Sequence, residues 1–475
     1  MDPRHIKPGD LIDGFRVEES LPPGGMATFW RVTRKDIDFP ILMKVPMLDA
    51  SEATAAIVGY ETECMILPRL AGPHVPRFVA SGDFDRPYIV MEHVQGASLK
   101  SFLDKLPIAP DEVATIGSHV AFALHDLHRQ HVLHLDLKPS NVILRADGTA
   151  VLIDFGLSHH LQLPDLIREE IEGPIGTGPY VAPEQVYGNR SDLRSDIFAL
   201  GVILYFFATG ERPHGDPQWT SGWKQRLWLD PVPPRRLNPA IPPALQEVTL
   251  RCLEADPAAR YATAGQVAFD LRHLENVRLT ERAFLKNRKG LLRSWWQRRK
   301  RRNTLAARQA QAEAASGHAP IIMAAVDLAE DAAPLSQAIA EAVRRLVATD
   351  PAARVACVNV LKTSRVAIDN AEDPQGRNLH LQRLIQLKHW SQAIVTDPGR
   401  VTHQVLEGVD PAALIVDYAR NNRVDHIVIG ARGSSALRQY LGSVSAQVMA
   451  RAPCTVTVVR RLAGTSHESS AEQQS

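Results

Sequence analysis

Three short segments of the chain carry side chains that suit the transfer of a phosphoryl group. They are His134-Leu135-Asp136-Leu137-Lys138-Pro139-Ser140-Asn141, Asp154-Phe155-Gly156 and Ala182-Pro183-Glu184. Transfer from ATP to a hydroxyl requires one carboxylate that accepts the hydroxyl proton, and an amide and a second carboxylate that hold magnesium ions on the phosphates. The first two segments supply these groups in that order. We therefore expect ATP and Mg²⁺ as cofactors.

The order and spacing of these segments resemble the motifs of the eukaryotic-type protein kinases, in the form found in bacterial serine/threonine kinases. The resemblance covers residues 9–275 and implies an α+β bilobal protein-kinase fold. It implies a phosphotransferase that moves the γ-phosphate of ATP to Ser or Thr hydroxyls of protein substrates. Lys138, two residues after Asp136, and the stretch Gly176-Thr177-Gly178-Pro179-Tyr180 are similar to the serine/threonine-specific kinases.

The resemblance implies a role for each polar residue of the catalytic segments. Asp136 is expected to be the catalytic base, and Lys138 is expected to neutralise charge on the γ-phosphate. Asn141 and Asp154 are expected to hold the metal. These four residues form the core of the expected site.

Two further residues are expected to support the catalytic segments from the interior of the protein. By the same resemblance, Asp196 would brace the backbone of the catalytic loop. Arg260 would pair with Glu184, and the loss of that pair would leave an uncompensated buried charge.

The phosphate-binding lysine is expected at the end of the apolar stretch Ile41-Leu42-Met43-Lys44. Lys44 needs a carboxylate partner on the following helix. We favour Glu63, because Leu67 and Leu70 follow it on one helix face, which would pack under the sheet. Glu61 is the alternative, and it cannot share that face because it lies two residues away.

The adenine site is expected around the strand Pro87–Val94, which resembles the strand that leads into the kinase hinge. Met91 would border the base, and backbone groups of Glu92 to Val94 would bind it. Gly24 and Gly25 lie where kinases cover the phosphates with a glycine-rich loop. Pro22 and Ala27 replace the other two glycines of that loop, and the proline should stiffen it.

The activation loop lacks the usual acceptors of a regulatory phosphate. Leu135 stands before Asp136, where many kinases have an arginine that pairs with a phosphorylated loop. The stretch from His159 to Gly176 contains no Ser, Thr or Tyr. The two absences agree, and they suggest a kinase that is not switched by phosphorylation of this loop.

A second domain is expected after a linker. Strand-like and helical patterns alternate beyond residue 318, which predicts a parallel α/β sheet. The expected strands are Pro320–Asp327, Arg354–Leu361, Thr402–Leu406, His426–Ile429 and Thr455–Val459. The expected helices are near residues 335–348, 379–395, 411–422 and 435–450. Residues 318–461 resemble the universal stress protein family, which implies a Rossmann-like domain with five parallel strands.

Part of that family binds ATP through a glycine-rich motif. The corresponding residues here are Gly430, Gly433, Gly442 and Ser443, with a spacing one residue shorter than the family pattern. Asp327, at the end of the first strand, would contact the ribose or base. The alternative is that these glycines only shape a tight turn. The last strand would lie at a sheet edge, where the family pairs two subunits, so we expect a homodimer.

The linker, residues 276–317, carries nine Lys or Arg and no acid between residues 286 and 302. With Leu291, Leu292, Trp295 and Trp296 among these charges, it suits either a solvated helix that packs on a domain or a helix on an anionic membrane. The first interpretation is favoured. Residues 462–475 are expected to be a disordered tail.

Composition limits the partners and the compartment. Lys plus Arg (54) and Asp plus Glu (53) nearly balance, so no nucleic-acid partner is expected. The four cysteines have no metal-type spacing and indicate a reducing compartment. The expected location is the cytoplasm, with the inner membrane surface as a peripheral alternative.

Two functions stay open on these grounds. The first is an active serine/threonine kinase with a C-terminal domain for nucleotide sensing or dimerisation. The second is a pseudokinase that acts as a nucleotide-dependent binding or scaffold module in a stress response, and it rests on Pro22, Pro23 and Ala27. Lys44, Asp136, Asn141 and Asp154 together favour the first.

Overall fold

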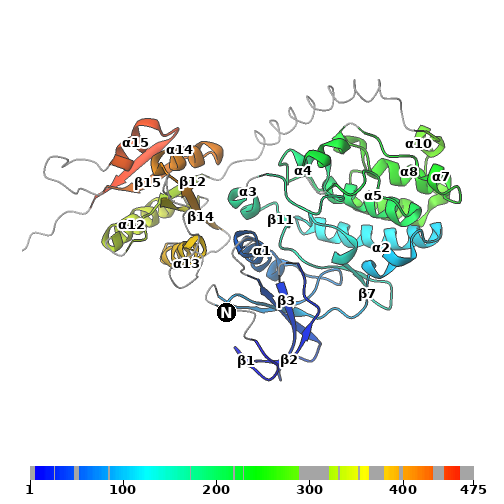
Figure 1. The fold of residues 1–475 in the computed structure, drawn as a ribbon, viewed down its shortest axis with the longest axis horizontal. Coiled ribbons are helices and arrows are strands. Elements are labelled where there is room, and N and C mark those ends of the chain that lie inside the picture. Colours follow the sequence, from blue (N-terminus) through cyan, green and yellow to red (C-terminus); the bar gives the residue numbers. More distant parts are fainter. Residues whose placement is uncertain are drawn as a thin grey trace, which may run out of the picture. The chain divides into compact units, whose positions relative to one another are not determined.

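The computed structural model divides the chain into two compact units, residues 1–317 and 318–475 (Figure 1). It describes residues 6–25, 27–47, 53–83, 86–171, 173–217, 220–227, 229–287, 320–329, 332–350, 353–362, 379–394, 400–431 and 443–460. The expected tail, the glycines at 433 and 442, and the linker from residue 288 lie outside the described residues.

The N-terminal lobe of the first unit is an antiparallel sheet with strand order β1-β2-β3-β4-β6-β5. Its strands are β1 (Leu11–Ile12), β2 (Phe15–Leu21), β3 (Ala27–Thr33), β4 (Ile41–Pro46), β5 (Phe78–Ser81) and β6 (Ile89–Glu92). Helix α1 (Ala53–Ile66) lies between β4 and β5 in the sequence. Met43 and Val45 are fully buried on one sheet face. Since side chains alternate along a strand, Lys44 must point from the other face.

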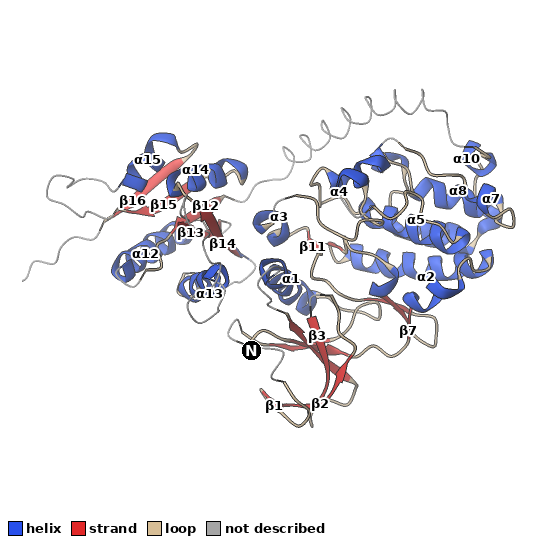
Figure 2. Cartoon of the chain, in the orientation of Figure 1, coloured by secondary structure: helices blue, strands red, loops and turns tan. Residues whose placement is uncertain are grey.

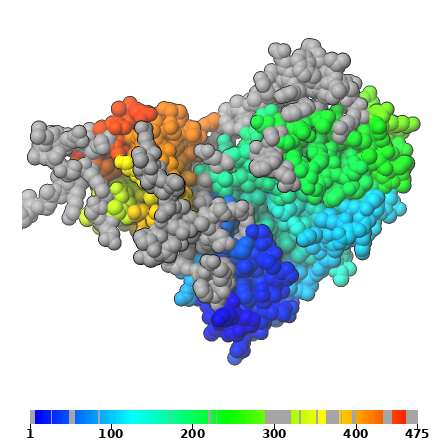
Figure 3. All heavy atoms as spheres, in the orientation of Figure 1, coloured from blue at the N-terminus to red at the C-terminus, as the bar shows by residue number. Residues whose placement is uncertain are grey.

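The second lobe of this unit is mainly helical, and Figure 3 shows it in cyan and green beside the blue sheet lobe. Its helices are α2 (Pro110–Arg129), α3 (Leu166–Glu170), α4 (Pro183–Val186), α5 (Arg194–Thr209), α6 (Thr220–Trp223), α7 (Pro234–Leu237), α8 (Pro243–Cys252), α9 (Ala264–Arg272) and α10 (Glu281–Phe284). The short strands of this lobe are β7 (Ala97–Ser98), β8 (Val132–Leu133), β9 (Val142–Leu144), β10 (Ala150–Leu152) and β11 (His159–His160), and the expected catalytic segments lie between β8 and β9 and after β10. Helix α5 is buried on nearly all sides, as its continuous apolar sequence requires.

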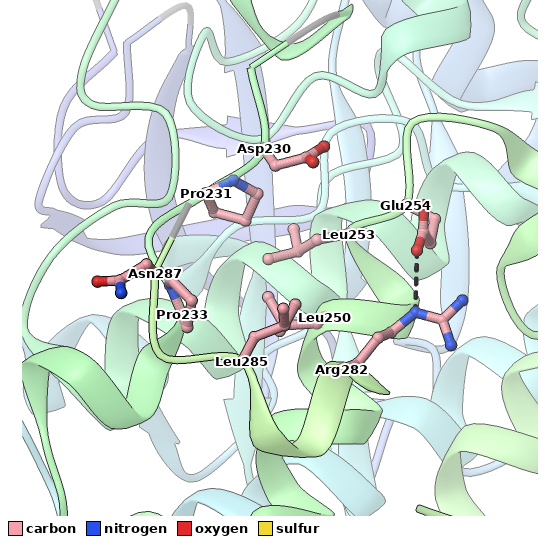
Figure 4. A pocket seen from close by; sticks show the side chains of 9 residues that line it. All are labelled: Asp230, Pro231, Pro233, Leu250, Leu253, Glu254, Arg282, Leu285 and Asn287. Atoms are coloured by element: carbon pink, nitrogen blue, oxygen red, sulfur yellow. Dashed lines mark hydrogen bonds and ion pairs between the residues drawn. The ribbon is translucent and has the colours of Figure 1, made fainter. Parts of the chain in front are cut away.

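The segment after α9 folds back onto the helical lobe. The carboxylate of Glu247 accepts hydrogen bonds from the backbone N–H groups of Thr280 and Ala283, at 3.0 Å each. Arg282 pairs with Glu247 and with Glu254, beside a small hollow that Asn287 also lines (Figure 4). The packed lobe therefore continues to residue 287, into the first part of the expected linker.

The second unit is a parallel sheet with strand order β14-β13-β12-β15-β16. The strands are β12 (Ile321–Ala325), β13 (Arg354–Lys362), β14 (Val401–Gly408), β15 (His426–Gly430) and β16 (Thr455–Val459). The helices are α12 (Ala333–Thr349), α13 (Leu379–Ser391), α14 (Pro411–Asn421) and α15 (Ser443–Arg451). The prediction of a five-stranded Rossmann-like domain is confirmed, and β16 lies at a sheet edge as expected.

Two separate hydrophobic clusters flank this sheet. Helices α14 and α15 cover one face and helices α12 and α13 cover the other (Figure 2). Every residue of the central strand β12 is buried, because both of its faces are covered. The observed strand β14 is longer than expected at both ends, and α13 ends four residues before the predicted end at 395.

Arg260 and Glu184 form the expected buried ion pair, with two hydrogen bonds at 2.7 and 2.8 Å between the guanidinium and the carboxylate. Their side chains are 0% and 3% exposed. We predict that Arg260→Met destabilises the first unit by about 3–5 kcal/mol, because Glu184 is left as an uncompensated buried charge. Urea unfolding followed by tryptophan fluorescence measures the loss.

The matched control is Arg31→Met, since Arg31 pairs with Glu19 while both side chains are half exposed. An exposed pair contributes at most about 1 kcal/mol. If both variants lost the same free energy of unfolding, the larger contribution expected of the buried pair would be contradicted.

Candidate active site

Lys44 joins three elements through two carboxylates. Its Nζ lies 2.5 Å from Oε2 of Glu63 on α1 and 2.7 Å from Oδ1 of Asp154 in the segment after β10. The backbone N–H of Phe155 donates to the other oxygen of Glu63, at 3.4 Å. The structure thus places Glu63, and not Glu61, beside the lysine.

The charges of this cluster stabilise one another. Burial alone would lower the pKa of Lys44, but the Asp154 and Glu63 carboxylates outweigh it and raise that pKa. The lysine lowers the pKa of Asp154 to about 2. Burial raises the pKa of Glu63, and Lys44 opposes that rise. Lys44 is therefore charged and Asp154 is ionised at neutral pH.

Asp136 is the centre of a second polar cluster. Its side chain is 6% exposed, and it accepts hydrogen bonds from Lys138 Nζ at 2.6 Å and from Thr177 Oγ1 at 2.7 Å. The backbone N–H of Thr177 and the side-chain amide of Asn141 donate to it as well, at 3.0 and 3.2 Å. Asp136, Lys138 and Asn141 are thus brought together as expected. Thr177 is an additional member, to which sequence reasoning assigned no role.

The backbone at both clusters is held in unusual conformations. Leu135 and Asp154 have φ angles of 60° and 68°, in a region that costs non-glycine residues about 1–3 kcal/mol. Asp196 braces the first of these positions. It accepts hydrogen bonds from the backbone N–H groups of His134 and Leu135, at 2.9 and 2.8 Å, and contacts His128 at 2.8 Å. The bracing role predicted for Asp196 is confirmed.

Strand β6, the expected hinge strand, leaves fewer backbone N–H groups for a base than expected, since those of Glu92 and His93 are already hydrogen-bonded. Met91 is buried. The backbone N–H of Glu92 donates to the carbonyl of Arg77, and its side chain pairs with Arg145 at 2.7 Å. Among the described residues, the peptide groups of Val94 make no hydrogen bond. Val94 is therefore the best candidate for binding the base.

The glycine-rich stretch forms the turn between β2 and β3. The N–H of Gly24 donates to the carbonyl of Ala27 at 3.0 Å. A Cβ atom on Gly24 would lie 3.0 Å from the Phe29 ring, whereas one on Gly25 would meet open space. Ala27 is buried and pairs with Pro46 in the sheet. Ala27 is thus the first residue of strand β3 and not part of the turn.

In the second unit, Asp327 lies two residues after strand β12, and Gly430 is the last residue of strand β15, which pairs with β12. The carboxyl ends of parallel strands meet at one sheet edge, where such folds bind ligands. The Asp327 carboxylate accepts a hydrogen bond from the N–H of Ala329, at 3.0 Å. Gly433 and Gly442 lie outside the described residues. Ser443 begins α15, and its side chain is not described.

We predict that Lys44→Met has a pH-dependent effect on stability. Without the lysine, the buried Glu63 has a pKa well above its ordinary value, so the folded state holds a proton that the unfolded state releases. The loss of stability therefore increases as pH rises from about 5 to about 8, and reaches about 3 kcal/mol at the upper end. Urea unfolding at several pH values measures it.

The double variant Lys44→Met with Glu63→Gln is the control, since glutamine has no proton to lose. It should show little of this pH dependence. A Lys44→Met deficit that is constant with pH would contradict the pairing of Lys44 with the buried carboxyl group of Glu63.

Comparisons with known proteins agree with both units. The model of the protein kinase domain family matches residues 15–270, and the model of the universal stress protein family matches residues 304–460. Serine/threonine-protein kinase PknB of Mycolicibacterium smegmatis is 30% identical over 271 residues, which are 56% of this chain and 43% of that protein. PknB of Mycobacterium tuberculosis is 28% identical over 275 residues, 57% and 44% of the two chains.

The chain thus spans less than half the length of these curated relatives. Among solved structures, the PknI kinase domain of Mycobacterium tuberculosis is 26% identical, covers 57% of this chain and 99% of its own, and has a TM-score of 0.44. No helix in the described part of the chain is long and apolar enough to cross a membrane. The kinase model alone matches more than half of the chain, which therefore belongs to the protein kinase family and continues into a region similar to the universal stress proteins.

Proposed function

We propose that the first unit is an active serine/threonine protein kinase. The observation that carries this proposal is the simultaneous presence of two assembled clusters, Lys44 with Glu63 and Asp154, and Asp136 with Lys138 and Asn141. A module that only binds nucleotide has no need for a carboxylate at Asp136 held among four donors. The named relatives are serine/threonine kinases, which supports the same function.

The residues fit a divalent metal such as Mg²⁺. Lys44 contacts only Oδ1 of Asp154, whose ionised side chain is 45% exposed. The amide nitrogen of Asn141 faces Asp136, and its oxygen accepts one hydrogen bond, from the Ser140 hydroxyl at 3.2 Å, so a second lone pair of that oxygen would face a cation. Carboxylate and amide oxygens are ligands that magnesium prefers. Asp154 and Asn141 would hold the metal, which would supply charge neutralisation at the phosphates when bound.

The substrate hydroxyl must displace a donor from Asp136 before that carboxylate can accept a proton. Thr177 Oγ1 and Lys138 Nζ are the candidates, because both lie on side chains that rotate. A departing Lys138 would turn to the γ-phosphate, where its charge stabilises the transferring group. The N–H of Thr177 and the amide of Asn141 would keep Asp136 oriented meanwhile.

We predict that purified protein with ATP and Mg²⁺ phosphorylates itself or a basic test protein on Ser or Thr. Asp136→Asn should lower kcat about 10²–10⁴-fold, since the general base is removed while the hydrogen-bonding shape is kept. Transfer of labelled phosphate, with phosphoamino-acid analysis, measures this. Asp147→Asn, an exposed aspartate of the same lobe, is the control and should match the wild type.

The second candidate is a pseudokinase that binds nucleotide as a scaffold. The observation that favours it is the stretch around Pro22 and Ala27, where Ala27 is fixed in β3. If the wild type transfers no more phosphate than Asp136→Asn while ATP still raises its melting temperature, this second candidate replaces the first.

For the second unit we propose dimerisation through β16. The carbonyl of Val459 accepts a hydrogen bond from Ala431, so alternate residues of β16 face β15 and the N–H of Val456 points to the open edge. An unpaired edge strand favours strand addition, and a two-fold dimer is the simplest closed product. Nucleotide sensing at Asp327 and Gly430 belongs to the same proposal and predicts that ATP raises the melting temperature of this unit.

Membrane contact through the basic linker is the less favoured of the two interpretations of that segment. Most of the segment lies outside the described residues. Binding of the full chain to vesicles with and without anionic lipid would decide between a membrane helix and a solvated linker.

We predict that the full chain is a dimer in light scattering, and that Val456→Pro makes it monomeric. Proline removes the N–H on the open edge and leaves the ladder with β15 intact. Val456→Thr is the control, because it keeps both the N–H and a β-branched side chain. A Val456→Pro protein that remains dimeric would assign the interface to another surface.

A further inference from the structure

Arg190 contacts the activation segment, which runs from Asp154-Phe155-Gly156 to Ala182-Pro183-Glu184, at three places, which together form a clasp. Its Nε lies 3.1 and 2.9 Å from the two carboxylate oxygens of Asp165. Its Nη2 donates to the carbonyl of Leu157 at 2.8 Å, just after the Asp154-Phe155-Gly156 segment. Its own carbonyl contacts the His159 ring at 2.9 Å. One side chain and its backbone thus fix the beginning and the middle of this segment.

The clasp is built into the protein and is not a surface contact. The side chains of Arg190 and Asp165 are 8% and 11% exposed. Asp165 has a second task, because it is the N-cap of the short helix α3 and accepts a hydrogen bond from the N–H of Arg168. A buried pair of this kind is specific, because either charge left alone would be strongly unfavourable.

Helix α3 connects the clasp to the catalytic lysine. It packs against α1, the helix that carries Glu63. Its residues Leu166 and Ile167 are buried in the hydrophobic cluster that also contains Ile66 of α1 and Phe155. The position of α1 decides whether Glu63 reaches Lys44. The chain of contacts therefore runs from Arg190 through Asp165 and α3 to the Lys44–Glu63 pair.

A phosphorylated side chain cannot order the activation segment of this protein in the usual way. Leu135 is apolar and 5% exposed, so it cannot bind one, and the loop from His159 to Gly176 has no hydroxyl side chain. In kinases that are switched on by phosphorylation, a phosphate and an arginine form the ion pair that orders the segment. Asp165 and Arg190 supply a carboxylate and a guanidinium at fixed positions instead.

We propose that Asp165 and Arg190 are positioning residues, whose ion pair permanently orders the activation segment and holds α1 in the arrangement that joins Glu63 to Lys44. This inference rests on the kinase function proposed above. It makes the ordered state a property of the sequence, and no modification of the loop is needed to reach it.

The variant Asp165→Asn removes the ion pair with Arg190 and keeps the helix cap. Asparagine caps a helix about as well as aspartate does, so only the charge is lost. We expect the kcat of Asp165→Asn to fall about tenfold, while its KM for ATP changes less than about threefold. The reason is that the alignment of the ATP phosphates depends on α1, whereas the binding of the adenine ring does not. Arg190→Lys keeps the charge but loses the forked geometry of the guanidinium, so its kcat should lie between those of the wild type and Asp165→Asn. Asp165→Glu keeps the charge but is a poorer helix cap, so its kcat should lie above that of Asp165→Asn and below that of the wild type.

Hydrogen exchange on the full chain tests the same inference without using activity. Asp165→Asn and Arg190→Lys should speed exchange of amides in α1 and α3 and leave those in β12–β16 unchanged. Asp216→Asn is the control, since Asp216 pairs with Arg212 and is half exposed in the same lobe. It should match the wild type in rate and exchange.

The outcomes separate this inference from the proposed function. An inactive wild type would overturn the kinase proposal, and hydrogen exchange would still decide whether the pair orders α1. Wild-type kcat and unchanged exchange of α1 in Asp165→Asn would overturn the inference and leave the kinase proposal standing. A variant with a lower melting temperature but an unchanged kcat at a temperature where it is folded would also overturn it.

Discussion

The geometry of the first unit depends on a constraint imposed by one buried cation. Lys44 is 16% exposed, and a charge in that position is tolerated only with carboxylates close by. The two that approach it belong to α1 and to the segment after β10, which come from different lobes. The requirement to neutralise one ammonium group therefore ties the sheet lobe to the helical lobe. The active arrangement is the one in which this charge is satisfied.

A second buried charge, next to the catalytic loop, is also stabilised by hydrogen-bond donors. Asp196 is 1% exposed and is stabilised by backbone N–H groups that an ordinary loop would leave to water. Burial tends to raise its pKa, but the hydrogen bonds from His128 and the backbone lower it. The carboxylate thus holds Leu135 in its left-handed conformation, and Asp136 follows directly. Glu184 and Arg260 form a further buried charged pair in the helical lobe.

The sequence predicts these elements where a local pattern has a physical meaning. Glu63 was distinguished from Glu61 by helix periodicity alone, and the five strands of the second unit followed from alternation. The pairing of Arg190 with Asp165 was not foreseen, because no periodicity links an irregular loop to a residue 25 positions away. Thr177 was also missed, since a hydroxyl gains its role only from the fold around Asp136. Val94 was not singled out within the expected hinge for a similar reason: the N–H groups of its neighbours Glu92 and His93 donate to the carbonyls of Arg77 and Pro40, which lie far away in the sequence.

The long reach of the buried contacts has a consequence for synthesis on the ribosome. The charge of Glu184 stays unpaired until Arg260, 76 residues later, has been synthesised. In the second unit, β12 waits for β15, which begins at residue 426. Pairing between distant segments is slow to form, because loop closure must precede the contacts that stabilise it. The nascent chain therefore exposes an incomplete helical lobe, and later a half-built parallel sheet, for much of its translation. Transiently exposed apolar surface and unpaired strand edges are prone to aggregation, so the yield of folded protein should depend on how quickly the chain is completed as well as on the stability of the finished fold.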